Sequence, residues 1–168
     1  MSESSNICLS CGCCCDGTLI GFVQLAREEV PALRNLLEIE NTEGEGFFLQ
    51  PCQNLGCDGC TIYTNRPTAC ADFDCGLLTS LNQKEIAYEE AIEVIAVVKQ
   101  KKIAIEQMME VLPFTLQSQS FYFKVLELKK LMRKDVTEST VTQDHPTFLA
   151  EVDQLDALLS EKFGVSFS

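Results

Sequence analysis

The sequence predicts an α+β fold that is mainly α, and two contrasts along the chain support this prediction. All ten cysteines lie in the first 75 of the 168 residues, in a turn-rich segment. The remainder carries apolar residues at helical spacing. We expect residues 1–80 to form an irregular cysteine-rich region with short strands and one helix. Residues 81–168 should form a helical region packed against it, within one folded unit.

The cysteine-rich region is expected to contain a few short elements. These are an extended segment or strand at 18–25, a helix at 28–39, a polar turn at 41–46 and a strand at 47–49. Val30, Leu33 and Leu37 share one face of the helix, and Pro51 ends the last strand. No repeat connects these elements.

The helical region is expected to contain three helices, at 84–112, 120–134 and 146–163. Gly164 suits the C-terminal cap of the last helix, and the single histidine, His145, lies near its start in a structural role. Three- to four-residue spacing predicts buried apolar stripes made of Tyr88, Ala91, Ile95 and Val98; Ile105, Met108 and Leu112; Phe121, Val125, Leu128 and Met132; and Phe148, Val152, Leu155 and Leu159.

The charge excludes two classes of partner. The net charge is −12, whereas nucleic acids and anionic membrane surfaces attract basic proteins. The first ten residues lack the basic and apolar segments of a secretory leader, and no apolar run reaches the roughly 18 residues of a transmembrane helix. We therefore expect a cytoplasmic protein, in which thiols stay reduced and dense cysteines more often bind metal than form disulfides.

The cysteines form two clusters: Cys8, Cys11, Cys13, Cys14 and Cys15, then Cys52, Cys57, Cys60, Cys70 and Cys75. Each cluster contains a C-x2-C pair, the spacing by which two thiolates bind one metal from a tight turn. The three adjacent cysteines of the first cluster suit a disulfide framework poorly. The spacing therefore predicts a site for a soft metal.

The order of these motifs resembles a known family. A C-x2-C-G-x-C-C run begins at Cys8, a P-C pair ends at Cys52, and Arg66-Pro67 lies between Cys60 and Cys70. This pattern, over about residues 8–76, is similar to the YkgJ-type, or CxxCxxCC, family of zinc- or iron-chelating proteins. The resemblance implies metal ligands at Cys8, Cys11, Cys14, Cys15, Cys52, Cys60 and Cys70, and at Cys75 in a looser part of the pattern. Cys13 and Cys57 fall outside the pattern and are extra ligands or free thiols.

Neither the metal nor the number of sites follows from the spacing. Four thiolates hold one zinc ion or one [4Fe–4S] cluster, so eight cysteines allow two sites, or one cluster with spare thiols. The family also includes flagellin lysine methylases; this resemblance implies that an iron–sulfur centre is one option here, but not that this chain methylates a substrate. Since one zinc ion has little room for both Cys14 and Cys15, we narrowly prefer an iron–sulfur cluster to Zn²⁺.

Two further residues are candidates for supporting the site. The Arg66 guanidinium can offset thiolate charge and donate hydrogen bonds to sulfur, or it can instead pair with Asp72 or Asp74. Tyr63 can hydrogen-bond across the same loop or simply pack there. Asp58, Asp72 and Asp74 are expected to be solvated loop charges, since soft metals with ample thiolates rarely need carboxylates.

The cellular role stays open at this level. The leading hypothesis is a metalloprotein of unknown role. The alternatives are an enzyme that uses the centre, a metal store or carrier, and a structural zinc module that presents acidic helices to a protein partner. The sequence contains no phosphate-binding loop, nucleophile elbow or H-E-x-x-H motif.

Overall fold

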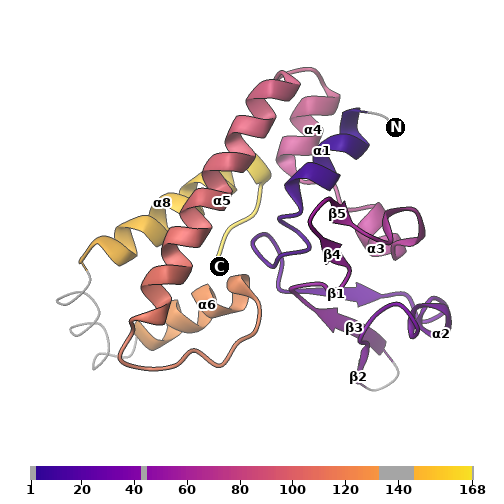
Figure 1. Ribbon diagram of the computed structural model, residues 1–168, viewed down its shortest axis with the longest axis horizontal. Coiled ribbons are helices and arrows are strands. Elements are labelled where there is room, and N and C mark those ends of the chain that lie inside the picture. Colours follow the sequence, from indigo (N-terminus) through magenta and orange to yellow (C-terminus); the bar gives the residue numbers. More distant parts are fainter. Residues whose placement is uncertain (1–2, 43–44, 133–145, 168) are drawn as a thin grey trace.

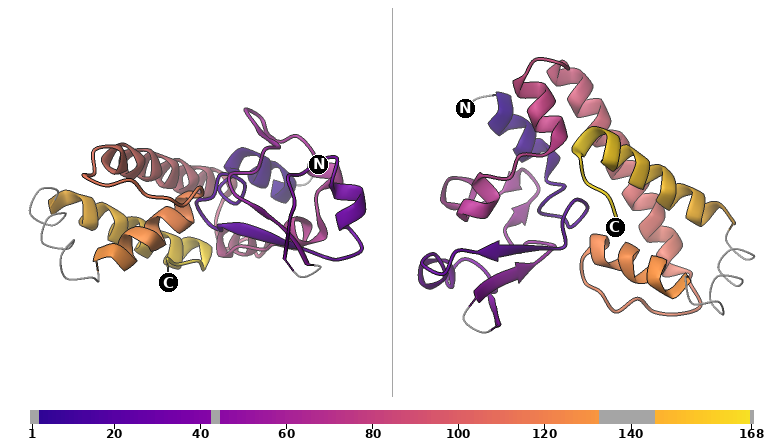
Figure 2. Two further views of the ribbon diagram at one scale, coloured as in Figure 1. Left: turned by 90° about the horizontal axis from the view of Figure 1, so that it is seen from below. Right: turned by 180° about the vertical axis from the view of Figure 1, so that it is seen from behind.

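The computed structural model describes residues 3–42, 45–132 and 146–167. It confirms the α+β, mainly α fold: small antiparallel strand pairs form the N-terminal half, and long helices follow. Figures 1 and 2 show the strands and the long helices side by side, with α1 (Glu3–Cys11) and α4 (Gly76–Asn82) between them. In the described part of the chain, no helix is long and apolar enough to cross a bilayer.

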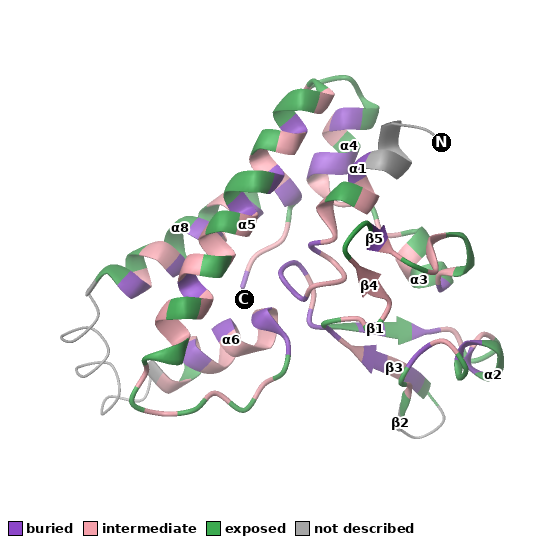
Figure 3. Ribbon diagram, viewed as in Figure 1, coloured by how far each residue is buried: buried purple, intermediate pink, exposed green. Residues whose placement is uncertain are grey.

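The long helices are α5 (Tyr88–Glu110), α6 (Phe121–Met132) and α8 (Pro146–Phe163). They confirm the three predicted helices, although His145 and residues 133–134 lie outside the described residues. The predicted stripes are buried at Ala91, Ile95, Val98, Ile105, Phe121, Val125, Leu128, Phe148, Val152, Leu155 and Leu159 (Figure 3). Tyr88, Met108 and Leu112 pack at the edge of this core. Apolar burial along these stripes therefore holds the helical region together.

The prediction that a helix begins at residue 84 is wrong. Residues before it form the separate helix α4, and α5 begins only at Tyr88. Lys84 has a left-handed backbone (φ 59°) and Ala87 is extended, so the chain cannot continue helically through this stretch. Residue 80, the predicted boundary between the regions, lies inside α4.

A three-stranded antiparallel sheet runs in the order β1 (Phe22–Leu25), β3 (Glu45–Leu49), β2 (Glu40–Thr42). The strands predicted within 18–25 and at 47–49 are confirmed. The predicted turn at 41–46 is wrong in extent, because β2 and β3 pair through Thr42 and Glu45, leaving 43–44 outside the described residues. A second, short ribbon joins β4 (Leu55–Gly56) to β5 (Gly59–Cys60).

The predicted helix at 28–39 is too long. Only the single turn α2 (Val30–Leu33) is helical. The Leu36 carbonyl accepts hydrogen bonds from the side chains of Gln53 (2.7 Å) and Asn54 (2.6 Å), which bind the chain where a helix would otherwise continue. The expected apolar face survives, since Val30, Leu33 and Leu37 are buried in a small second core with Val23, Leu25 and Phe48.

The helical region holds the first cysteine cluster in place. α1 packs against α5 and α4. Lys99 of α5 donates to the Ser10 carbonyl (2.8 Å), and Lys102 pairs with Asp16 (3.3 Å) in the loop after α1. Asp16 also accepts from the amide (2.9 Å) and hydroxyl (2.6 Å) of Thr18. The loop that carries Cys13, Cys14 and Cys15 is therefore tied at both ends.

Replacing Gly59 by alanine is expected to destabilise the protein by about 2 kcal/mol or more. Gly59 has φ +101°, and a Cβ there would lie 2.5 Å from the Leu9 carbonyl oxygen of α1. The substitution therefore forces β5 away from α1. Denaturant unfolding measures the loss. The matched control is Gly164→Ala, also at positive φ (+67°) but with nothing within 4 Å of the new Cβ; an equal loss for both variants would contradict the clash.

Candidate metal centre

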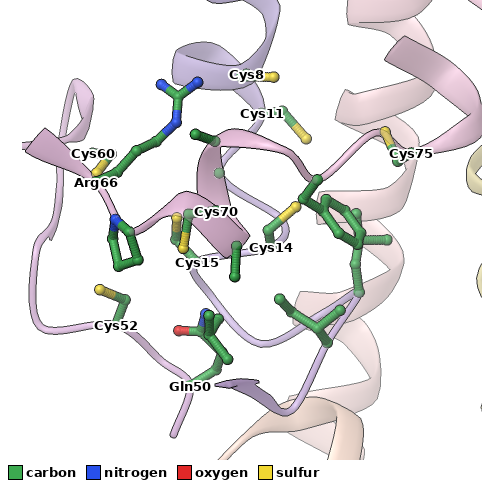
Figure 4. Close-up of a pocket in the computed structure, with 18 of the residues that line it drawn as sticks. Cys8, Cys11, Cys14, Cys15, Gln50, Cys52, Cys60, Arg66, Cys70 and Cys75 are labelled. Carbon is green, nitrogen blue, oxygen red and sulfur yellow. The ribbon is translucent and has the colours of Figure 1, made fainter. Parts of the chain in front are cut away.

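One cavity of about 460 Å³ gathers cysteines from both sequence clusters (Figure 4). Its wall includes eight of the ten: Cys8, Cys11, Cys14, Cys15, Cys52, Cys60, Cys70 and Cys75. These are the same eight positions that the family resemblance implies as ligands. Segments 37 to 67 residues apart in the sequence thus present their thiols to a common space.

Six separate pieces of backbone supply the eight thiols. Cys8 and Cys11 lie one turn apart on α1 and so share its face. Cys14 and Cys15 follow in the loop that begins at Gly12, which has φ +63°. The other four lie after β3 (Cys52), on β5 (Cys60), on the short helix α3, Thr68–Ala71 (Cys70), and at the N-cap of α4 (Cys75).

Cys13 and Cys57 are not on the cavity wall. Cys13 is fully buried in the larger apolar core, and its thiol donates to the Cys11 carbonyl (3.7 Å). Cys57 is exposed between β4 and β5. The structure therefore places both residues that lie outside the family pattern away from the shared cavity.

The cavity thiols fall into two neighbourhoods. Around Cys15 lie Cys52, Cys60 and Cys70, whose charges, after burial, contribute most to raising the Cys15 pKa to about 12. The Cys52 amide also donates to the Cys15 carbonyl (2.7 Å). Figure 4 shows the sulfurs of Cys15 and Cys70 side by side, with Cys52 and Cys60 on either side of them.

The second neighbourhood surrounds α1. Burial, followed by the charges of Cys75 and Cys11, raises the pKa of Cys8 to about 11. Burial and then the charges of Cys11 and Cys75 raise the pKa of Cys14 well above its usual value. α1 packs directly on α4, which brings Cys75 to this group.

Burial makes most of these thiols hard to ionise. It raises the pKa of Cys70 to about 11 and also raises the pKa values of Cys52 and Cys75. At Cys11 the direction is the opposite, because the hydrogen bond from Cys13 lowers its pKa. In the described residues, no three Cys, His, Asp or Glu side chains already converge closely enough to hold one ion. Binding a metal therefore requires the thiols to lose protons and draw inward.

Metal affinity is expected to rise steeply with pH. Cys8, Cys15 and Cys70, with pKa values of about 11, 12 and 11, are protonated at pH 7 in the metal-free protein. Bound thiolates are deprotonated, so each one releases a proton, and each proton contributes up to about tenfold in affinity per pH unit below the thiol pKa. Metal competition titrations between pH 6 and 8 measure this slope. An affinity independent of pH would contradict thiol ligation.

Arg66 lines the same cavity. Its guanidinium carbon lies 3.8 Å from the centre of the Tyr63 ring, and Nη1 donates to the Tyr63 carbonyl (3.1 Å). Its charge lowers the pKa values of Cys8 and Cys70, opposing the effect of burial. Among the described residues, Arg66 makes no ion pair with Asp72 or Asp74, and its buried Nε has no hydrogen-bond partner.

The other polar residues considered as site candidates differ in where they lie. Asp58, Asp72 and Asp74 are exposed, as expected of solvated loop charges, although Asp74 reaches the cavity rim. His145 lies outside the described residues. Gln50 was not predicted: it is 2% exposed, lies on the cavity wall, and its Oε1 has no partner within the described part of the chain. In the sequence, the only signal for Gln50 was its position directly before the Pro51-Cys52 pair.

Comparison with known proteins identifies the family. Residues 7–93, just over half of the chain, match the model described as "CxxCxxCC: Putative zinc- or iron-chelating domain". Searches of curated proteins and of solved structures find no match. The matched segment contains every cysteine and all cavity residues except Ile95 and Phe163. By its motifs and by this match, the chain belongs to the CxxCxxCC family of zinc- or iron-chelating domains.

Proposed function

We propose that this protein is a cytoplasmic iron–sulfur protein whose cavity cysteines are the ligands. The observation that carries the proposal is the gathering of eight thiols on one cavity wall. Thiolates are the ligands preferred by iron–sulfur clusters and by zinc, and the only cation on the wall among the described residues is Arg66. The donor set therefore suits a soft metal centre and offers little to a hard cation such as magnesium.

The spread of the thiols supports a cluster over single zinc ions. In a tetrahedral zinc site with bonds of about 2.3 Å, the four sulfurs lie about 3.8 Å from one another. In a cubane each thiolate binds a different iron atom, so the four sulfurs lie farther apart. The cavity of about 460 Å³ has room for the larger group. Crowding of Cys14 and Cys15 no longer supports this choice, since the two face different neighbours.

The proposed compartment suits this ligand set. A reducing cytoplasm keeps cysteines as thiols that are available to bind metal.

The second candidate is a structural zinc module, or a metal store or carrier, that presents the acidic helical surface to a protein partner. One observation favours a partner: Val97 and Ile103 of α5, and Val111 at its C-cap, lie at the surface and are 43%, 54% and 64% exposed. Large apolar side chains on an outer helix face are typical of a docking surface only when they form a patch. This candidate therefore ranks second.

An anaerobic absorption spectrum with elemental analysis separates the two candidates. An iron–sulfur protein is expected to be brown, with broad visible absorption that bleaches with dithionite and iron and sulfide in equal amounts. A colourless protein containing zinc would replace the first candidate by the second. Less than about one centre per chain after anaerobic loading would reject both, because four thiolates normally hold one zinc ion or one cubane.

A further inference from the structure

We infer that the eight cavity cysteines form two separate four-thiol centres rather than one. The helix set is Cys8, Cys11, Cys14 and Cys75, and the loop set is Cys15, Cys52, Cys60 and Cys70. This inference rests on the proposed function, because it assumes that these thiols bind metal. It holds whether the metal is zinc or iron.

The helix set is organised by α1 and its contact with α4. Cys8 and Cys11 lie on the same face of α1. Cys75 caps α4, which packs against α1, and Cys14 follows the end of α1 by three residues. In Figure 4 the Cys14 sulfur points toward the side of Cys11 and Cys75, away from Cys52.

The loop set is organised by one hydrogen bond between two loops, by the β4–β5 ribbon and by the packing of α3. The Cys52 amide donates to the Cys15 carbonyl (2.7 Å), and the Leu55 amide donates to the Cys52 carbonyl (3.0 Å). Leu55 in turn pairs with Cys60 across the β4–β5 ribbon. Cys70 approaches from α3, which packs against β1. These four thiols are thus neighbours on the cavity wall, supplied by segments other than α1.

The division runs between two adjacent residues, Cys14 and Cys15. The loop that carries them is fixed by the Asp16–Lys102 ion pair (3.3 Å) and by the Gly17 carbonyl, which accepts from the Tyr122 amide (2.8 Å). With the backbone held in this way, the two side chains diverge, and each completes a different set. Cys14 and Cys15 therefore face different groups of thiols: Cys11 and Cys75 act most on Cys14, and Cys60, Cys52 and Cys70 act most on Cys15.

Arg66 lies where two anionic centres would meet. Four thiolates around Zn²⁺, or around a [4Fe–4S]²⁺ core, carry a formal charge of 2−, so adjacent centres repel each other. The Arg66 guanidinium interacts with Cys8 of the helix set and with Cys70 of the loop set. Figure 4 shows its side chain passing Cys60 and extending toward Cys8. A cation in this position stabilises two neighbouring centres at once.

The test is the number of centres in wild type and in paired alanine variants. After anaerobic loading, separately with zinc and with iron and sulfide, metal per chain is measured by elemental analysis and native mass spectrometry. Wild type should hold two zinc ions or two clusters. C11A and C60A should each retain one centre. The same-set double C11A/C75A should still retain one, whereas the cross-set double C11A/C60A should retain none. Cys57→Ala, outside the cavity, should retain both.

The outcomes distinguish this inference from the proposed function. A wild-type protein without metal rejects the proposed function itself. A wild-type protein with a single centre, or loss of all metal from C11A or from C11A/C75A, overturns the division and leaves metal binding standing. The second same-set double variant, C60A/C70A, repeats the test with the loop set, so that misfolding of one variant does not decide the result. The centre that C60A/C70A retains shows that the rest of its chain is folded.

Discussion

Removing the metal is expected to loosen the cysteine-rich region and to leave α5, α6 and α8 in place. Among the described residues, the larger apolar core joins nineteen buried residues and is dominated by these helices, whereas the core between the sheet and α2 joins six. A core that small contributes little stability on its own. Metal–thiolate bonds that join separate loops then supply much of the stability of that region.

The size of the effect follows from linkage. Removing the metal loses several kcal/mol of binding free energy. Each kcal/mol corresponds to about 2–4 °C in Tm for a chain of this size, so Tm should fall by about 10 °C or more. Amide hydrogen exchange, compared with and without a chelator, should rise across residues 12–75 and stay slow in the long helices. Reloading the metal should restore protection. Equal exchange in both states would show that the cysteines do not stabilise this region through metal.

Arg66→Gln is expected to weaken metal binding by about 10- to 100-fold, the usual cost of losing a group that supports metal ligands. Among the described residues, the Arg66 guanidinium is the one cation on the cavity wall, and it favours the thiolate forms of Cys8 and Cys70. Glutamine keeps hydrogen-bonding capacity and removes the charge. In an iron–sulfur protein, the same change should also make the reduction potential more negative, because the added electron loses a stabilising cation.

Two control variants separate charge from packing. Arg34→Gln removes the same charge from an exposed position off the cavity wall and should leave affinity unchanged. Arg66→Lys keeps the charge, loses the planar stacking on Tyr63, and should lie between wild type and R66Q. Competition titration with a metal indicator measures all four proteins. If R66Q and R34Q bind alike, Arg66 serves only to pack against Tyr63.

The helical region could be predicted well because its signal is local. Val98, Val125, Leu155 and their neighbours repeat at helical spacing, and most of these repeats are buried. The helix predicted at 28–39 failed because its end depends on distant groups, the Gln53 and Asn54 side chains that bind the Leu36 carbonyl. Helix α1 was not predicted, since its sequence is largely polar at the start and it gains its packing from distant segments, α5, α4 and β5.

The identity of the cysteines on the cavity wall could be predicted, but their arrangement in space could not. Motif order identifies the eight cysteines that the structure brings together. It cannot say that Cys14 and Cys15 diverge while Cys13 enters the apolar core, because that depends on the loop backbone held by Lys102 and Asp16. The supporting contact of Lys99 with Ser10 likewise joins residues far apart in the sequence and leaves no local pattern.

X-ray absorption at the edge of the bound metal tests most directly whether thiols drawn from distant segments hold it. The metal-loaded wild-type protein should give only sulfur neighbours, at about 2.3 Å from the metal, with no nitrogen or oxygen bonded to it. Cys57→Ala should give the same spectrum, since Cys57 is exposed and off the cavity wall. A metal bonded mainly to nitrogen or oxygen would contradict the account.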